Sequence, residues 1–175
     1  MLPKGKCPPR KPIEKIIWSI VGSFLGIYLI ASLSQLYQLD SKDILFLIGS
    51  FGATAVLLYG APMAEFSQPR NLVGGHVFSA LVGVTVFSLT GDDLAIASSL
   101  AVSLSIGVMH LTRTLHPPGG ATALIAIIGG DKIHQLGYYY VIYPVLIGAL
   151  LMLLVALFVN NMSRSPMRHY PVYWI

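Results

Sequence analysis

The 175-residue chain is 55% hydrophobic and only 10% charged, with a mean hydropathy of +0.73 and a formal net charge of +4. A soluble domain carries about 25% charged residues, so this composition excludes an ordinary water-soluble fold. Because the apolar residues form continuous runs and do not alternate, a membrane β-barrel is also disfavoured. An all-α, polytopic bundle of transmembrane helices is therefore predicted, as a single domain.

About six membrane elements are expected, since each full crossing needs about 20 apolar residues. A basic, proline-rich arm over residues 1–15 precedes them and a short tail over residues 161–175 follows. We interpret the arm as retained, because no convincing small-residue cleavage site follows it. In chain order, the apolar stretches are Ile16–Tyr37, Ile44–Ala61, Leu72–Leu89, Leu94–Thr112, Pro118–Gly130 and Tyr138–Asn160.

The fifth stretch is short for a membrane crossing. At about 1.5 Å rise per residue it reaches only about 20 Å, whereas the hydrocarbon core is about 30 Å thick. It is predicted to be a half-helix or a broken segment. Four or five full spans with re-entrant pieces are the alternative to six crossings.

The charged residues predict the orientation. Lys and Arg concentrate in the N-terminal arm, the second and fourth connections and the tail, whereas most Asp residues fall in the other connections. Cytoplasmic connections retain positive charge, so both termini are predicted to be cytoplasmic. The arm also lacks the Ser- and Arg-rich composition of a transit peptide, which favours a bacterial type of inner membrane.

A short internal repeat suggests two related halves. Residues 52–57 read GATAVL and residues 120–125 read GATALI, an offset of 120 − 52 = 68 residues. The same offset carries the third stretch onto the last one. An inverted repeat of three elements each, over 16–90 and 94–160, is therefore predicted. Alternatively, small residues simply recur where helices cross closely.

The densest polar cluster lies between the fourth and fifth stretches. Pro117 and Pro118 should break the helix, and Gly119 and Gly120 allow close backbone approach. A helix that restarts there would point unpaired N–H groups into the bundle and, with Arg113, could seat a small anion. The candidate substrate-binding residues of this cluster are His110, Arg113, His116, Gly119, Gly120 and Thr122.

Two of these residues have alternative roles. His110 and Arg113 would share a face if they lie on one helix, yet Arg113 could equally be a cytoplasmic anchor. His116 could brace the break by bonding to a freed carbonyl, or it could contact substrate or a proton.

A second cluster joins the second and third stretches on the same side. Pro69 is expected to stop helix formation before Arg70, and Asn71 to cap the following span. His76 lies inside an apolar run, where an ionisable residue is either functional or a neutral histidine bonded to a carbonyl. These residues, with Arg70 and Asn71 as substrate contacts, complete the second half of the candidate site.

Thr54 occupies the repeat position that matches Thr122. Both hydroxyls could line a shared pathway, or they could simply bond one helix to another. Gly52, together with Pro69, Pro117 and Pro118, is expected to interrupt regular helix.

Several classes of function find no support in the residues. No nucleophile motif, phosphate-binding loop or pair of intramembrane carboxylates occurs, so no enzymatic activity and no cofactor are expected. The histidines lack a compact ligand spacing, which argues against a metal site. Anionic headgroups explain the basic arm more simply than nucleic acid does. Close-packing glycines suggest a homo-oligomer, such as a dimer.

Three blocks resemble the HPP family of integral membrane proteins, which is named for the tripeptide that here is His116-Pro117-Pro118. They are residues 116–123 (HPPGGATA), residues 51–57 (FGATAVL), and residues 68–71 (QPRN) followed by Gly74-Gly75-His76. The resemblance implies a transporter-like protein, usually with four membrane spans. Members in chloroplasts and cyanobacteria are associated with nitrite transport.

The leading hypothesis is that the protein, embedded in the lipid bilayer, lets a small monovalent anion pass, with nitrite as the first candidate. One alternative is a channel for a small neutral or protonated species in which the histidines act as relays. The other is a membrane sensor or scaffold that transports nothing.

Overall fold

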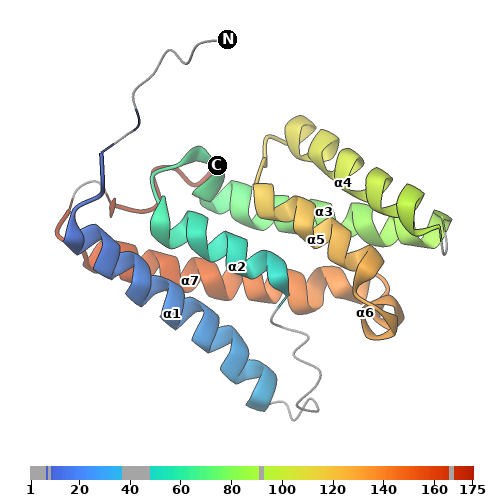
Figure 1. The fold of residues 1–175 in the computed structure, drawn as a ribbon, viewed down its shortest axis with the longest axis horizontal. Coiled ribbons are helices and arrows are strands. Elements are labelled where there is room, and N and C mark those ends of the chain that lie inside the picture. The colour runs from blue at the N-terminus through green and yellow to red at the C-terminus, as the bar shows by residue number, and fades with distance from the viewer. Residues whose placement is uncertain (1–6, 8, 37–47, 91–92, 166–167) are drawn as a thin grey trace.

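The computed structural model describes residues 7, 9–36, 48–90, 93–165 and 168–175. Every regular element in this part of the chain is helical, as predicted, and the helices run roughly along the long axis of the molecule (Figure 1). The elements are α1 (Ile13–Leu36), α2 (Gly49–Ala55), η1 (Val56–Gly60), η2 (Glu65–Ser67), α3 (Pro69–Thr90), α4 (Leu94–Leu111), α5 (Pro117–Ile128), α6 (Asp131–Leu136), η3 (Val141–Leu146) and α7 (Ile147–Met162).

Among the described residues, four helical stretches are long and apolar enough to cross a membrane. The four are Ile13–Leu33, Pro69–Thr90, Leu94–Leu111 and Val141–Met162. The chain is therefore an integral membrane protein, and the four stretches match the number implied by the resemblance. The other two predicted elements are shorter.

The two short elements are half-helices. α5 has 12 residues, so it reaches about 18 Å, which agrees with the prediction for the fifth stretch. α2 and the π-helical turn η1 together cover residues 49–60; residues 44–47 of the predicted second stretch lie outside the described part. α2 packs against α5, and the two run in opposite directions (Figure 1). The inverted repeat itself stays a prediction.

Glycines let aromatic side chains of α2 and η1 sink between the long helices. The ring of Tyr59 lies against Gly22 and Gly26 of α1, and its hydroxyl donates to the Met152 carbonyl at 3.2 Å. The ring of Phe51 lies against Gly148 of α7. Residues larger than glycine at these positions would meet the rings, so these contacts fix the half-helix between α1 and α7.

The second predicted break is placed differently from expectation. Pro69 does not stop a helix before Arg70, because α3 begins at Pro69 itself. A proline suits the first helical position, where its missing N–H would have no partner. Asn71 consequently lies inside the first turn and is not the cap; the residue before the helix is Gln68.

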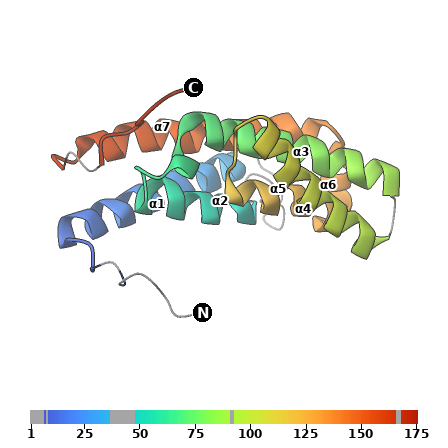
Figure 2. The ribbon, with the colours of Figure 1, turned by 90° about the horizontal axis from the view of Figure 1, so that it is seen from above.

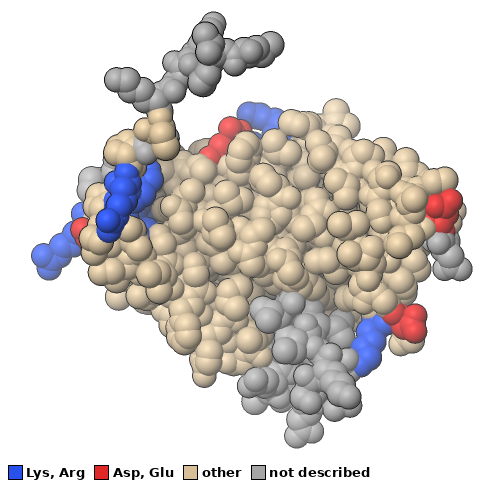
Figure 3. All heavy atoms as spheres, in the orientation of Figure 1, with Lys and Arg blue, Asp and Glu red and all other residues tan. Residues whose placement is uncertain are grey.

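Charged residues lie mostly at the two ends of the molecule. On the face drawn in Figure 3, most Lys and Arg lie towards the end where α1 begins, Asp and Glu are seen at both ends, and uncharged residues cover most of the middle. Figure 2, turned by 90°, shows the same lengthwise alignment of the helices. The start of α1 and the end of α7 lie at the same end, where Ser163 donates to the Glu14 carboxylate at 3.3 Å. That this end is cytoplasmic stays a prediction.

Candidate functional site

A buried chain of polar side chains joins the two half-helices to α3. Thr54 of α2 lies 2.8 Å from Nε2 of His76 and 3.1 Å from Nε2 of His116. On the other side of its ring, His76 Nδ1 lies 2.7 Å from the Thr122 hydroxyl of α5. The Thr122 and Ser50 hydroxyls are 2.9 Å apart. All five side chains are fully buried.

These five residues, Ser50, Thr54, His76, His116 and Thr122, are called the His–Thr network below. Four of them were predicted site residues from two separate clusters and the repeat. The network brings them together because α2, α3 and α5 meet at this point.

One contact fixes the proton arrangement at one end of the network. His116 Nδ1 lies 2.7 Å from the carbonyl oxygen of Phe66, which can only accept, so Nδ1 carries a hydrogen. In a neutral imidazole the other nitrogen, Nε2, is then an acceptor, and Thr54 donates to it. His116 thus bonds to a carbonyl, but to that of Phe66 in η2 and not to one freed by the two prolines; its role stays a prediction.

The rest of the network follows from that choice. With its hydrogen given to His116, Thr54 can only accept from His76 Nε2, and His76 Nδ1 then accepts from Thr122. The Ser50 hydroxyl can rotate to complete the chain. The two neutral histidines are thus fully satisfied without any charged partner.

The same heavy-atom positions also suit one additional proton. Thr54 lies 3.1 Å from the Ser50 carbonyl oxygen as well as from His116 Nε2, so its single hydrogen has two acceptors. If His116 takes a second hydrogen at Nε2, the Thr54 hydroxyl can accept from Nε2 and donate its own hydrogen to the Ser50 carbonyl oxygen instead. The network therefore has the geometry to receive or release a proton by rearranging hydrogens alone.

Aromatic contacts enclose the histidines. The rings of His76 and His116 have centroids 4.8 Å apart at an interplanar angle of 61°. The Phe51 ring lies edge-on to His76, with centroids 5.3 Å apart. Burial among these rings orients both imidazoles.

Glycines of α3 and α5 set the short spacing around the network. A Cβ on Gly75 would collide with the Cβ of His116, and one on Gly74 would lie 2.5 Å from Thr114 Cγ2. A Cβ on Gly119 would lie 2.7 Å from both the Gly75 carbonyl oxygen and the Ser79 hydroxyl. Close packing of α3 at its first turns was expected, and these three glycines provide it.

The start of α5 differs from the predicted anion seat. α5 begins at Pro117, so its first two residues carry no N–H, and the N–H of Gly119 donates to the His116 carbonyl at 2.7 Å. The prolines that break the chain thus also remove the donors that an anion would need. Gly120 is half-buried. A Cβ added there would meet only Val102 Cγ1, at 3.9 Å, among the described residues.

The cations of the predicted site lie away from the network. His110 is an exposed residue in the last turn of α4, and Arg113 follows the helix end with a left-handed backbone of φ 58°. They do not share a helix face, because α4 ends at Leu111. Arg70 is half-buried in the first turn of α3.

Arg70 and Arg113 nevertheless belong to segments that contact each other. The Asn71 amide donates to the Leu115 carbonyl at 2.9 Å, which ties the start of α3 to the loop that follows α4. Nε of Arg70, Oδ1 of Asn71 and the Ser79 hydroxyl are buried without a hydrogen-bond partner.

Two contributors were missed from the sequence. Ser50 lies four residues before Thr54 on one helix face, a spacing that could have indicated it. Tyr140 precedes η3, and its hydroxyl donates to the Thr122 carbonyl at 3.1 Å; nothing in the apolar run around it signals this contact. The described residues include no group of three His, Cys, Asp or Glu side chains placed to hold a metal.

Comparisons with known proteins agree with the fold and with the clusters. Two curated relatives from Dictyostelium discoideum, each named only as a transmembrane protein, are 46% and 45% identical over 172 and 174 residues. The matches cover 97% and 98% of this chain but 54% and 60% of the relatives, so the chain spans somewhat over half their length. No solved structure matches.

The relatives' names indicate neither a substrate nor a cyanobacterial or plastid type, and their organism gives no support for a bacterial origin. Nitrite and the bacterial membrane therefore stay predictions. The family model described as "HPP, transmembrane region" matches residues 8–171, and the chain belongs to this family of membrane proteins.

Proposed function

We propose that the protein lets a small monovalent anion cross the membrane, with nitrite as the first candidate, and that the anion passes beside the His–Thr network. The observation that carries this proposal is the network itself. Ionisable side chains at membrane depth are costly and mark pathways for ions or protons. Here two histidines lie at the contact of two half-helices, where irregular backbone lines transport paths in other membrane proteins.

The start of α3 and the loop that follows α4 carry positive charges that could attract an anion. Arg70 and Arg113 lie in the two segments joined by the Asn71 to Leu115 bond, and Nε of Arg70 is free to donate. A positive mouth raises the local concentration of anions. The network below it contains N–H and O–H donors, and its spare proton position lets a histidine carry positive charge while an anion is near.

A second candidate is passage of a neutral or protonated small molecule. It is favoured by one observation: the acceptors and donors within the network are satisfied without a cation, and the exposed Arg113 lies outside it. In this version the protonated form of the substrate crosses, and the network exchanges the proton.

Flux through liposomes tests both versions. Purified protein reconstituted into liposomes should move nitrite faster than empty liposomes do, and His116→Gln should reduce the flux because the glutamine cannot exchange a proton between two nitrogens. His110→Gln is the matched control, since His110 is exposed at the end of α4. The control should retain the wild-type rate.

An imposed membrane potential separates the two candidates. Passage of a charged anion should follow the potential, whereas passage of the protonated species should follow the pH gradient and ignore the potential. Nitrite flux equal to that of empty liposomes under both conditions would contradict the proposal.

A further inference from the structure

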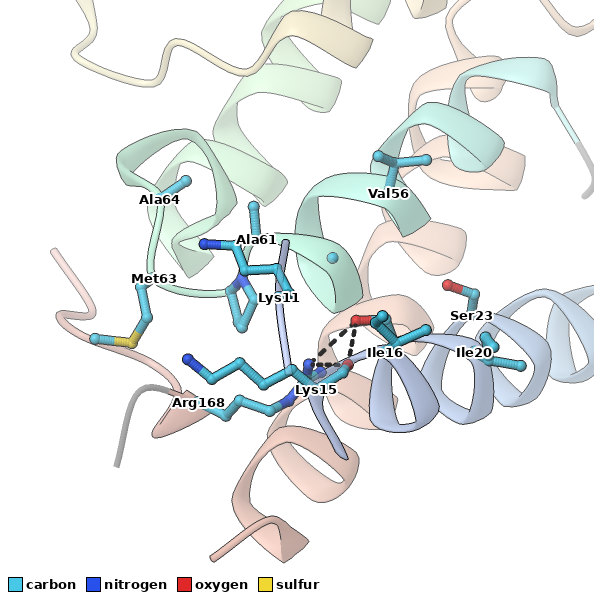
Figure 4. A pocket seen from close by; sticks show the side chains of 13 residues that line it. Lys11, Lys15, Ile16, Ile20, Ser23, Val56, Ala61, Met63, Ala64 and Arg168 are labelled. Atoms are coloured by element: carbon cyan, nitrogen blue, oxygen red, sulfur yellow. Dashed lines mark hydrogen bonds between the residues drawn. The ribbon is translucent and has the colours of Figure 1, made fainter. Parts of the chain in front are cut away.

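A cavity of about 800 Å³ lies beside the start of α1, apart from the His–Thr network. Its walls come from the first turns of α1, from η1 and from the turn at Ala61–Ala64. Figure 4 shows Lys11 and Lys15 extending next to each other towards this turn, with Arg168 below Lys15. The cavity is therefore at the end of the molecule where the basic arm enters the first span.

Among the described residues, three cations and no carboxylate line the cavity. They are Lys11, Lys15 and Arg168. Lys11 is exposed and Lys15 is half-buried, so both ammonium groups can meet a ligand at the rim. Three positive charges, with no acidic residue among the described residues of the lining, predict an anionic ligand.

Arg168 is a fixed, buried charge in this set. Its side chain is 2% exposed, and its guanidinium donates to the Tyr59 carbonyl at 2.9 Å and to Asn160 Oδ1 at 2.7 Å. It also donates to the Lys15 carbonyl at 3.1 Å and to the Ser19 hydroxyl at 3.2 Å. All four acceptors are uncharged, and Nε is buried without a partner. These bonds orient the charge, and the described residues give it no direct salt bridge; the carboxylate that acts on it is that of Glu14, which does not line the cavity.

The remainder of the wall is apolar and faces the position of lipid tails. Ile20 and Val56 line the cavity and are 63% and 68% exposed in the isolated chain. Ile20 lies within the candidate membrane span that begins at Ile13, and Val56 lies in η1, which packs against α1. If α1 crosses the bilayer from Ile13, the cationic rim is at the membrane surface and the apolar wall extends into the hydrocarbon. A free inorganic anion would gain nothing from this wall, whereas a lipid would cover it.

We propose that this cavity binds an anionic phospholipid, with its phosphate held by Lys11 and Lys15 next to the buried positive charge of Arg168, and with its acyl chains along Ile20 and Val56. Basic pockets between membrane helices bind anionic headgroups in this way. The site is independent of the proposed transport function, because it shares no residue with the His–Thr network.

Lipid titration of the purified full chain in neutral detergent tests the proposal, with phosphatidylglycerol and phosphatidylcholine compared by native mass spectrometry. The wild type should prefer phosphatidylglycerol. The double variant Lys11→Gln/Lys15→Gln should bind phosphatidylglycerol roughly 30-fold more weakly, since each lysine near an anionic headgroup contributes about 1 kcal/mol. Binding of phosphatidylcholine should not change.

The matched control is Arg10→Gln/Arg164→Gln, which removes the same two charges from exposed residues that do not line the cavity. This control should change the affinity by less than twofold at the same salt concentration. An equal loss in both double variants would mean diffuse surface attraction and would overturn the site. Displacement of the lipid by inorganic phosphate or nitrite at millimolar concentration would assign the cavity to a free anion and would also overturn it.

Discussion

Adjacent glycines at the start of α5 allow a matched test of the packing that builds the site. An added Cβ at Gly119 would lie 2.7 Å from the Gly75 carbonyl oxygen and from the Ser79 hydroxyl, and 3.0 Å from Met109 Sδ. An added Cβ at Gly120 would meet only Val102 Cγ1, at 3.9 Å, which is ordinary van der Waals contact. The two positions are otherwise alike, because both follow the same two prolines in the first turn.

The expected magnitude follows from these contacts. Gly119→Ala forces α5 away from α3 by several tenths of an ångström, and overpacking of this kind costs about 1–3 kcal/mol. Alanine also favours the helix over glycine by about 0.5–1 kcal/mol, but this gain is common to both variants and cancels in their difference. Gly119→Ala should therefore be about 1–3 kcal/mol less stable than Gly120→Ala.

Thermal unfolding in detergent checks the difference. For a chain of this size 1 kcal/mol shifts Tm by about 2–4 °C, so the two variants should differ by about 2–12 °C. Gly120→Ala should match or exceed the wild-type Tm. Equal Tm values for the two variants would refute the close approach of α3 and α5, and with it the geometry of the His–Thr network.

Three further predictions concern single contacts and use the same unfolding measurement. Gly52→Ala should be tolerated, because an added Cβ there meets nothing within 4 Å, whereas Gly148→Ala should destabilise by about 1–3 kcal/mol against the Phe51 ring; equal effects would contradict this packing. Tyr140→Phe removes the bond to the Thr122 carbonyl and should cost about 0.5–1.5 kcal/mol, against no change for the exposed Tyr139→Phe. Arg168→Met leaves Asn160 Oδ1 unpaired, at about 1–3 kcal/mol, whereas the Tyr59 carbonyl still accepts from the Ser19 hydroxyl at 2.7 Å; a Tm like that of the exposed control Arg164→Met would show that the Asn160 bond contributes nothing.

Sequence reasoning found the membrane elements because long apolar runs and proline-glycine breaks leave few alternatives in lipid. α4, for example, was predicted over Leu94–Thr112 and is observed over Leu94–Leu111. The short α5 was recognised from its length alone. Pro69 was misread, since a proline ends one helix and begins the next with equal ease, and the sequence around it contains both signals.

The site was predicted in parts. His76, His116 and the two threonines were chosen separately, but only the fold shows that Thr54 lies between the two imidazoles. The role of the cations in the site was overestimated. The sequence places Arg113 three residues before His116, but it does not show that the Arg113 side chain is exposed at the end of α4. The number of free N–H donors at the start of α5 was also overestimated. Two prolines in its first turn have no N–H, and the N–H of Gly119 is bonded to the His116 carbonyl.

An anion is proposed to pass beside the His–Thr network, and the Thr54 hydroxyl is the link on which that network depends. Nitrite flux into liposomes should therefore be compared for wild type, Thr54→Ser and Thr54→Val, with equal amounts of folded protein verified by size-exclusion chromatography. Serine keeps the hydroxyl between the two Nε2 atoms and should retain most of the flux, whereas the isosteric valine breaks the chain of hydrogen bonds and should reduce the flux to near that of empty liposomes. Wild-type flux through Thr54→Val would contradict the account.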